Sequence, residues 1–226
     1  MAMPPSLGNY SNGLFRLVLL VFSSDVAEAL GNLWRLARHI FNARAHEGMY
    51  EVLEYETLLE LKDTRGETAV YHKRERVRFA QDHIIAFQDQ AWGDGEIFAD
   101  YKCSPGEAVD RYREGDRYRI LISLRETKHR GDVEEFRIER TIKDGFSTNI
   151  EDFQTEIDHP TERLSLSVIF PAQRLPKHVA LIERNRARTI ALGPGHFQTL
   201  PDGRQKVAWS TKKPRLFEAY ILRWQW

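Results

Sequence analysis

The sequence has little cysteine, no excess of charge and no long apolar run, and each shortage excludes a class of protein. A single cysteine, Cys103, cannot form an intrachain disulfide or complete a cysteine-based zinc site. Lysine plus arginine number 33 and aspartate plus glutamate number 33, so the net charge is zero and the strongly basic composition of many nucleic-acid-binding domains is missing. These shortages predict a reducing, cytoplasmic location and argue against nucleic acid as a partner.

The longest apolar run, residues 14–22, is too short for a helix that spans a bilayer, which needs about 20 residues. Residues 1–13 are rich in proline, serine, glycine and asparagine and predict a flexible tail. Asp25 and Glu28 predict a capping box, and the apolar spacing that follows predicts an amphipathic helix over about 25–45. We expect this helix to pack on the rest of the protein, with peripheral membrane contact through 14–45 as the alternative.

From residue 49 onward the apolar positions alternate, which predicts β-strands. After a first hairpin over 53–61 and 69–79, strands are expected at 95–102, 117–127, 133–142, 151–158, 163–170, 178–184, 187–192, 204–210 and 215–226. Turn signals such as Pro201-Asp202-Gly203 separate them. Short strands at this spacing indicate an antiparallel sandwich or barrel, and the missing strand–helix–strand rhythm excludes a parallel nucleotide-binding sheet.

A loop at Cys103-Ser104-Pro105-Gly106, followed by a charged stretch through Asp116, suggests a domain boundary. We therefore predict a mainly β protein with four parts. They are a tail over 1–13, an apolar segment and helix over 14–48, a hairpin-rich region over 49–103, and an antiparallel β-sandwich of about immunoglobulin size over 104–226. The alternative is one domain over 49–226.

The basic run from Tyr71 to Arg78 could track phosphates, but the hairpin register argues against this function. If Asp63 pairs with Glu67 across the turn that contains Gly66, Arg74 faces Glu56 and Arg76 faces Glu54. Opposite charges across a ladder stabilise a sheet by about 0.2–1 kcal/mol per pair. We therefore expect this run to serve the fold.

The last strand is apolar on both faces, with Tyr220, Trp224 and Trp226 on one face and Ile221 on the other. A strand of this kind is central or covered, so the C-terminus should be fixed in the core. An exposed aromatic platform for a ligand is the alternative.

Arg184, Arg186 and Arg188 occupy alternate positions, which predicts a cationic strand face or a tight loop. Guanidinium groups bind carboxylates and phosphates through two parallel hydrogen bonds. These three arginines are therefore our candidate site for an anionic small molecule or an acidic protein surface.

Residues 88–96 combine acids, Trp92 and two glycines, and we expect them to form a loop. Trp92 and Asp94 are candidate ligand- or partner-binding residues. Together with His83, Asp89 and Glu96, Asp94 could form a hydrolase site, although the spacing matches no metal-ligand pattern.

The sequence contains no phosphate-binding glycine loop, no nucleophile elbow and no metal-binding spacing of its eight histidines. We therefore predict a non-enzymatic intracellular binding or adaptor module that acts through protein–protein contacts, with no cofactor and no metal. The two alternatives are a sensor of an anionic small molecule at the three arginines and a hydrolase in the 83–96 segment.

Overall fold

A computed structural model describes residues 48–226, so the tail and the helix predicted before them lie outside the described residues. The described part consists of fourteen strands and one short 3-10 turn, which confirms the mainly β fold. The strands are β1 (Tyr50–Leu61), β2 (Thr68–Phe79), β3 (Ile84–Ala91), β4 (Glu96–Ser104), β5 (Glu107–Glu114), β6 (Arg117–Lys128), β7 (Val133–Lys143), β8 (Ile150–Glu156), β9 (Arg163–Phe170), β10 (His178–Glu183), β11 (Arg188–Ala191), β12 (Phe197–Thr199), β13 (Gln205–Lys212) and β14 (Ala219–Gln225), with η1 (Pro194–His196) before β12.

The largest sheet has seven strands in the order β12-β13-β9-β1-β2-β7-β4. Its neighbours run antiparallel except β1 and β9, which pair in parallel with Tyr55 opposite Leu164. The expectation of a purely antiparallel arrangement is wrong at this pair. Alternation along a strand does not reveal the direction of a partner that lies far away in the chain, and the long segment between β1 and β9 supplies the crossover that a parallel pair requires.

The first hairpin forms in the predicted register, with Arg74 opposite Glu56 and Arg76 opposite Glu54. Gly66 in its turn adopts a left-handed conformation, with φ of 76°. The Asp63 carboxylate accepts hydrogen bonds from the backbone N–H groups of Arg65 and Thr68 at 2.8 and 2.7 Å, which closes the turn.

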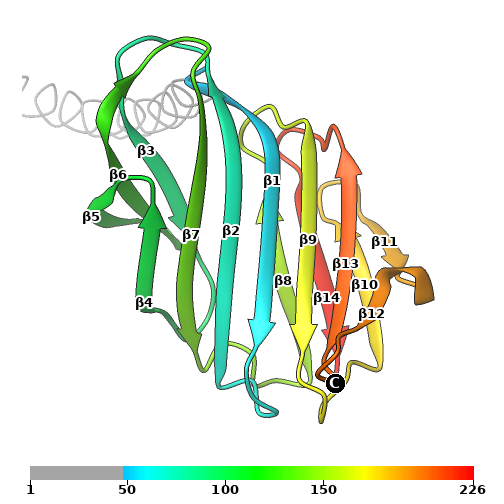
Figure 1. Ribbon diagram of the computed structural model, residues 1–226. Coiled ribbons are helices and arrows are strands. Elements are labelled where there is room, and N and C mark those ends of the chain that lie inside the picture. Colours follow the sequence, from blue (N-terminus) through cyan, green and yellow to red (C-terminus); the bar gives the residue numbers. More distant parts are fainter. Residues whose placement is uncertain (1–47) are drawn as a thin grey trace, which may run out of the picture. The chain divides into compact units, whose positions relative to one another are not determined.

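Two smaller sheets pack on one face of the seven-stranded sheet. A four-stranded sheet in the order β11-β10-β14-β8 lies behind β1, β9 and β13, and a three-stranded sheet in the order β3-β6-β5 lies near β7 (Figure 1). The Thr57 and Thr155 hydroxyls, 3.2 Å apart, join β1 to β8, and the rings of Phe87 and Phe136, 3.9 Å apart, join β3 to β7.

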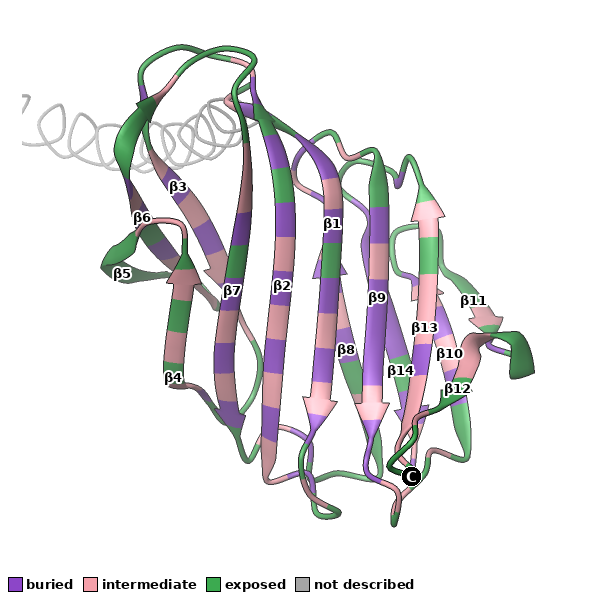
Figure 2. Ribbon diagram, in the orientation of Figure 1, coloured by how far each residue is buried: buried purple, intermediate pink, exposed green. Residues whose placement is uncertain are grey.

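The core fills the space between these sheets, and buried positions alternate with more exposed ones along β1, β2 and β7 (Figure 2). The last strand has the predicted central place, since β14 lies between β10 and β8. Trp224 and Trp226 are buried, at 1% and 5% exposure, which confirms that the C-terminus belongs to the core.

Three strands fall where the sequence predicts none: β3, β5 and the three-residue strand β12. Residues 84–91 form β3, although 88–96 is expected as a loop, and residues 107–114 form β5, although only a charged connection is expected there. In β3 the polar Asp89 is buried between the buried Phe87 and Ala91, so a polar side chain lies on the inner face and the usual alternation is hidden. In β5 every residue is exposed, so no apolar alternation develops.

No helix within residues 48–226 is long and apolar enough to cross a membrane. The division of the chain at residue 104 stays a prediction.

Candidate functional site

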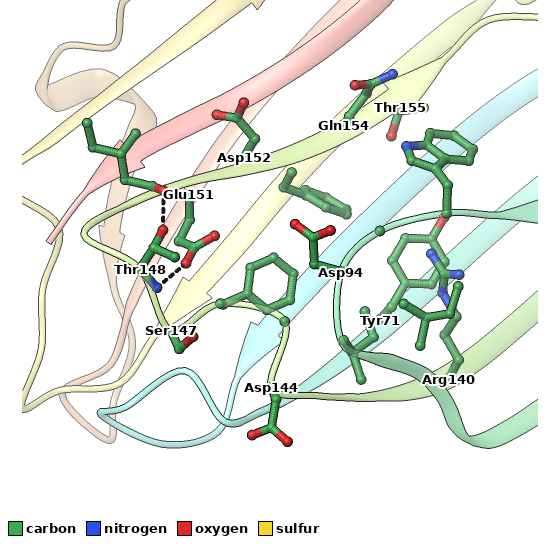
Figure 3. A pocket seen from close by; sticks show the side chains of 18 of the residues that line it. Tyr71, Asp94, Arg140, Asp144, Ser147, Thr148, Glu151, Asp152, Gln154 and Thr155 are labelled. Carbon is green, nitrogen blue, oxygen red and sulfur yellow. Dashed lines mark hydrogen bonds between the residues drawn. The ribbon is translucent and has the colours of Figure 1, made fainter. Parts of the chain in front are cut away.

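A cavity of about 500 Å³ lies between the inner face of the seven-stranded sheet and the strand β8. Its walls come from β1, β2 and β7, from the β3–β4 loop and from the loop and strand that follow β7 (Figure 3). This volume lies within the range of pockets that hold small organic molecules.

The floor of the cavity is aromatic and contains one buried cation. Arg140 is 7% exposed and projects from the inner face of β7, where Tyr71 of β2 and Tyr101 of β4 are its neighbours in the ladders. Its guanidinium lies 4.4 Å from the centre of the Tyr71 ring, and its Nε and Nη1 atoms have no hydrogen-bond partner among residues 48–226. Buried donors without hydrogen-bond partners are unfavourable, which makes Arg140 the most unusual side chain of the cavity.

The aromatic side chain at the entrance is held by a polar network. The Arg117 guanidinium lies 4.8 Å from the centre of the Trp92 ring. Arg117 and Arg119 donate hydrogen bonds to Gln90 Oε1 at 3.4 and 2.8 Å, and Gln90 Nε2 donates to Asp158 at 3.0 Å. Trp92 is therefore fixed beside the cavity by residues of β3 and β6.

Four carboxylates lie on the rim of the cavity, and they differ in their contacts. Asp152 forms an ion pair with Arg223 at 2.7 Å, and Glu151 accepts a hydrogen bond from the backbone of Thr148. Within residues 48–226, no ion pair or hydrogen bond is recorded for the side chains of Asp94 and Asp144, which are both exposed. The rim therefore offers unpaired negative charge above a buried positive charge.

A second group of buried charges lies farther along the inner face of β2. Lys73 Nζ is 2.6 Å from Glu75 and 3.1 Å from Asp89, and Tyr101 donates a hydrogen bond to Asp89 at 3.0 Å. Burial alone would lower the pKa of Lys73, but the negative charges of Glu75 and Asp89 raise it well above its ordinary value. Burial raises the pKa of Tyr71 to about 12. These groups keep a lysine charged and a tyrosine neutral inside the core.

The structure brings three of the five predicted binding residues to this cavity: Trp92, Asp94 and Arg184. The other two turn away, because Arg186 and Arg188 lie 3.3 and 3.7 Å from Glu183. Residues 184–187 form the turn between β10 and β11, so the tight-loop interpretation of the arginine cluster holds and the strand-face interpretation is wrong.

The hydrolase hypothesis needs His83, Asp89, Asp94 and Glu96 in one place, and the structure separates them. His83 precedes β3 and Asp94 follows it, so the eight residues of the strand place them roughly 25 Å apart. Asp89 is 2% exposed and is bound by Lys73. Among residues 48–226, no cluster of three or more histidine, cysteine, aspartate or glutamate side chains could hold a metal ion.

Sequence reasoning missed Arg140, the buried cation of the floor, although a signal was present. Phe136, Ile138, Arg140 and Ile142 follow one another at alternate positions of β7, and the other three are buried and apolar. A charged residue at an inward position of a strand marks either a buried ion pair or a binding site.

A second, more open groove of about 670 Å³ crosses the outer face of the seven-stranded sheet. Its charges largely pair with one another: Arg74 contacts Glu54, Glu56 and Glu135 at 2.8–3.1 Å. The basic run of β2 is thus neutralised, in agreement with its predicted structural role.

Comparisons with known proteins give neighbours by structure alone. No protein-family model and no curated protein sequence matches the chain. Among solved structures it is similar to the M1 zinc metallopeptidase from Deinococcus radiodurans, with 12% identity and a TM-score of 0.46 over 76% of this chain and 42% of that chain. The E323A mutant of that enzyme gives 11% identity and a TM-score of 0.48 over the same shares. A candidate protease from Parabacteroides distasonis gives 10% identity and 0.46, over 79% and 40%.

The prediction of a non-enzymatic adaptor is corrected by these neighbours, because their names are those of peptidases and therefore of hydrolases. They agree better with the hydrolase alternative. This chain spans about two-fifths of the length of the neighbouring chains, and at this identity and TM-score the likeness transfers no activity, metal or substrate to it.

Proposed function

We propose that this chain binds a small organic anion in the cavity between its sheets and that Arg140 holds the acidic group. The supporting observation is the buried guanidinium of Arg140, whose Nε and Nη1 atoms lack hydrogen-bond partners. Guanidinium groups bind carboxylates and phosphates through charge-assisted hydrogen bonds, so the acidic group of a ligand would give this buried charge a partner. This is the sensor alternative with its cation moved from the β10–β11 turn to the floor of the cavity.

The surroundings of Arg140 favour an organic ligand over a simple ion. The cavity of about 500 Å³ is lined by buried apolar and aromatic side chains, including Ile97, Phe146 and Phe153. An apolar body would displace water from these side chains, at about 25 cal/mol for each Å² of apolar surface buried. Arg184 also lines the cavity and would add a second positive charge at the rim. Its guanidinium is held there by a hydrogen bond that it donates to Gln154 at 2.6 Å.

The test is the variant Arg140→Met, with Arg137→Met as a matched control. Arg137 lies on the same strand but on its outer face, where it pairs with Glu135 at 2.7 Å. We expect 3-phenylpropanoate or phenyl phosphate to raise the melting temperature of the natural protein and of Arg137→Met, but not of Arg140→Met. A ligand present at about 100 times its Kd stabilises a protein by about 2.7 kcal/mol, which is easily measured.

Melting temperatures measured without ligand distinguish a binding role of Arg140 from a structural role. If Arg140 is held for a ligand, Arg140→Met removes an unfavourable buried charge, and its melting temperature without ligand stays unchanged or rises. A clear fall would show that Arg140 supports the fold through Tyr71 and Phe98, whose ring centres lie 4.4 and 6.0 Å from its guanidinium. Ligand stabilisation that survives in Arg140→Met would overturn the proposal.

We also propose a fold class and a cellular location for this protein. The first is a β-sandwich as the fold class, antiparallel except at the β1–β9 pair, which the packing of the four-stranded sheet on the seven-stranded sheet supports. The second is a reducing, cytoplasmic location, which the single cysteine supports.

A further inference from the structure

The rim of the cavity carries exposed carboxylates beside Arg184, whereas the floor carries the buried cation Arg140. Arg140 lies on the floor and is buried, whereas Asp94 and Asp144 lie on the rim and are exposed (Figure 3). No ion pair within 4.0 Å joins Asp94 to Arg140 or to any other cation of residues 48–226. A molecule that neutralises only Arg140 would therefore bring its remaining atoms against unpaired carboxylates.

The position of Asp94 is fixed by the backbone around it. Gly95 has φ of 74°, and a Cβ at this position would lie 2.1 Å from the carbonyl oxygen of Lys143. The β3–β4 loop is thus packed directly against the end of β7, the strand that carries Arg140. Asp94 and Arg140 are therefore held on two backbone segments that contact each other.

We infer that the ligand is a zwitterion of the amino acid or short-peptide class. Its carboxylate binds Arg140 on the floor, its apolar part packs on Phe146 and Phe153, and its ammonium group contacts Asp94 at the rim. This inference rests on the anion site proposed above and adds the second charge of the ligand. A hydrogen bond between two charged groups is about twice as strong as one between neutral groups, so the ammonium group should raise affinity about tenfold.

The experiment compares two pairs of probes that differ only in the ammonium group. The first pair is L-phenylalanine and 3-phenylpropanoate, and the second is glycyl-L-phenylalanine and its N-acetyl derivative. Affinities are measured by calorimetry on the natural protein, on Asp94→Asn and on the control Asp110→Asn, which changes an exposed carboxylate of β5. We expect at least one pair to show about tenfold tighter binding of the zwitterion, with the preference lost in Asp94→Asn and kept in Asp110→Asn.

Every other outcome contradicts either the zwitterion inference alone or both this inference and the proposed anion site. If both members of each pair bind equally and Arg140→Met abolishes that binding, the zwitterion inference is overturned and the anion site stands. If the zwitterions bind more tightly but Asp94→Asn keeps the preference, Asp94 does not contact the ammonium group and the inference also fails. If no probe binds at millimolar concentration, both the inference and the proposed function are overturned.

Discussion

At the scale of single residues, the core of this protein contains charges that contact one another instead of water. Lys73, Glu75 and Asp89 are 6%, 4% and 2% exposed, and the lysine lies between the two carboxylates. Lys73 also lies 5.0 Å from the centre of the Tyr55 ring. Because the group holds two negative charges and one positive charge, its stability depends on the single lysine.

Replacing Lys73 should therefore strongly destabilise the folded protein. Lys73→Met leaves two buried carboxylates without a cation, and we expect the free energy of unfolding to fall by about 3–5 kcal/mol. The control Glu75→Gln leaves one carboxylate with one lysine and should change it by less than about 1 kcal/mol. Urea denaturation at neutral pH measures both changes. A loss for Lys73→Met no larger than that for Glu75→Gln would show that the carboxylates take up protons instead.

The same residues show where sequence patterns stop being informative. Asp89 is buried and Arg140 is buried, but inside a strand a polar residue is normally assigned to the solvent face. Asp89 therefore interrupted the apolar alternation by which β3 could have been predicted. The lysine that pairs with it, Lys73, lies on another strand and gives no signal in the local sequence. Arg140 could have been noticed, because it interrupts an apolar face, but no sequence pattern reveals that its donors stay unpaired.

At the scale of elements, the turn between β1 and β2 reaches the loop that closes the cavity. A Cβ on Gly66 would lie 1.7 Å from the carbonyl oxygen of Phe146, and the Phe146 backbone N–H donates a hydrogen bond to Gly66 at 3.2 Å. Phe146 in turn stacks on Trp224 at 5.8 Å. Contacts from Gly66 to Phe146 and from Phe146 to Trp224 therefore connect the first hairpin, the cavity and the last strand.

Gly66→Ala should destabilise the protein through both backbone strain and this contact. We expect a loss of about 2–4 kcal/mol in the free energy of unfolding. Gly115→Ala is the control, because Gly115 has φ of 64° but no atom within 4 Å of an added Cβ. It should lose only about 1–2 kcal/mol, the cost of the left-handed conformation alone. Equal losses in thermal denaturation would refute the contact with Phe146.

The elements divide into those that local chemistry determines and those that it does not. The register of β1 and β2 follows from one turn and the charges along both strands, and it was predictable. The strand β9 begins and ends at the predicted residues, since its alternation is uninterrupted. The strand β5 was not predictable, because within residues 48–226 it pairs only with β6 and buries none of its residues.

At the scale of the whole molecule, buried tyrosines make stability sensitive to alkaline pH. Burial raises the pKa of Tyr50 and Tyr55 well above 10.0 and that of Tyr71 to about 12. Between pH 10 and about 12 the unfolded chain loses these protons while the folded protein keeps them. The free energy of unfolding therefore falls as pH rises through this range, by up to about 1.4 kcal/mol per pH unit for each tyrosine.

Urea titrations across this range measure the slope, and Tyr50→Phe should make it shallower. The control Tyr112→Phe removes a tyrosine that is 49% exposed and should leave the slope unchanged. An identical slope in Tyr50→Phe and in the natural protein would show that Tyr50 ionises in the folded state as easily as in the unfolded chain.

The parallel pair of β1 and β9 has a consequence for the growing polypeptide. The strand β1 has β2 on one side as soon as the first hairpin closes, but its other side stays open until the ribosome has delivered Phe170. An open strand edge invites pairing with other chains, and folds that depend on such distant contacts form slowly. Glu54, Glu56 and Glu60 along β1 supply charge during this interval, so these acids, two of which face arginines of β2, can also protect the nascent chain from aggregation.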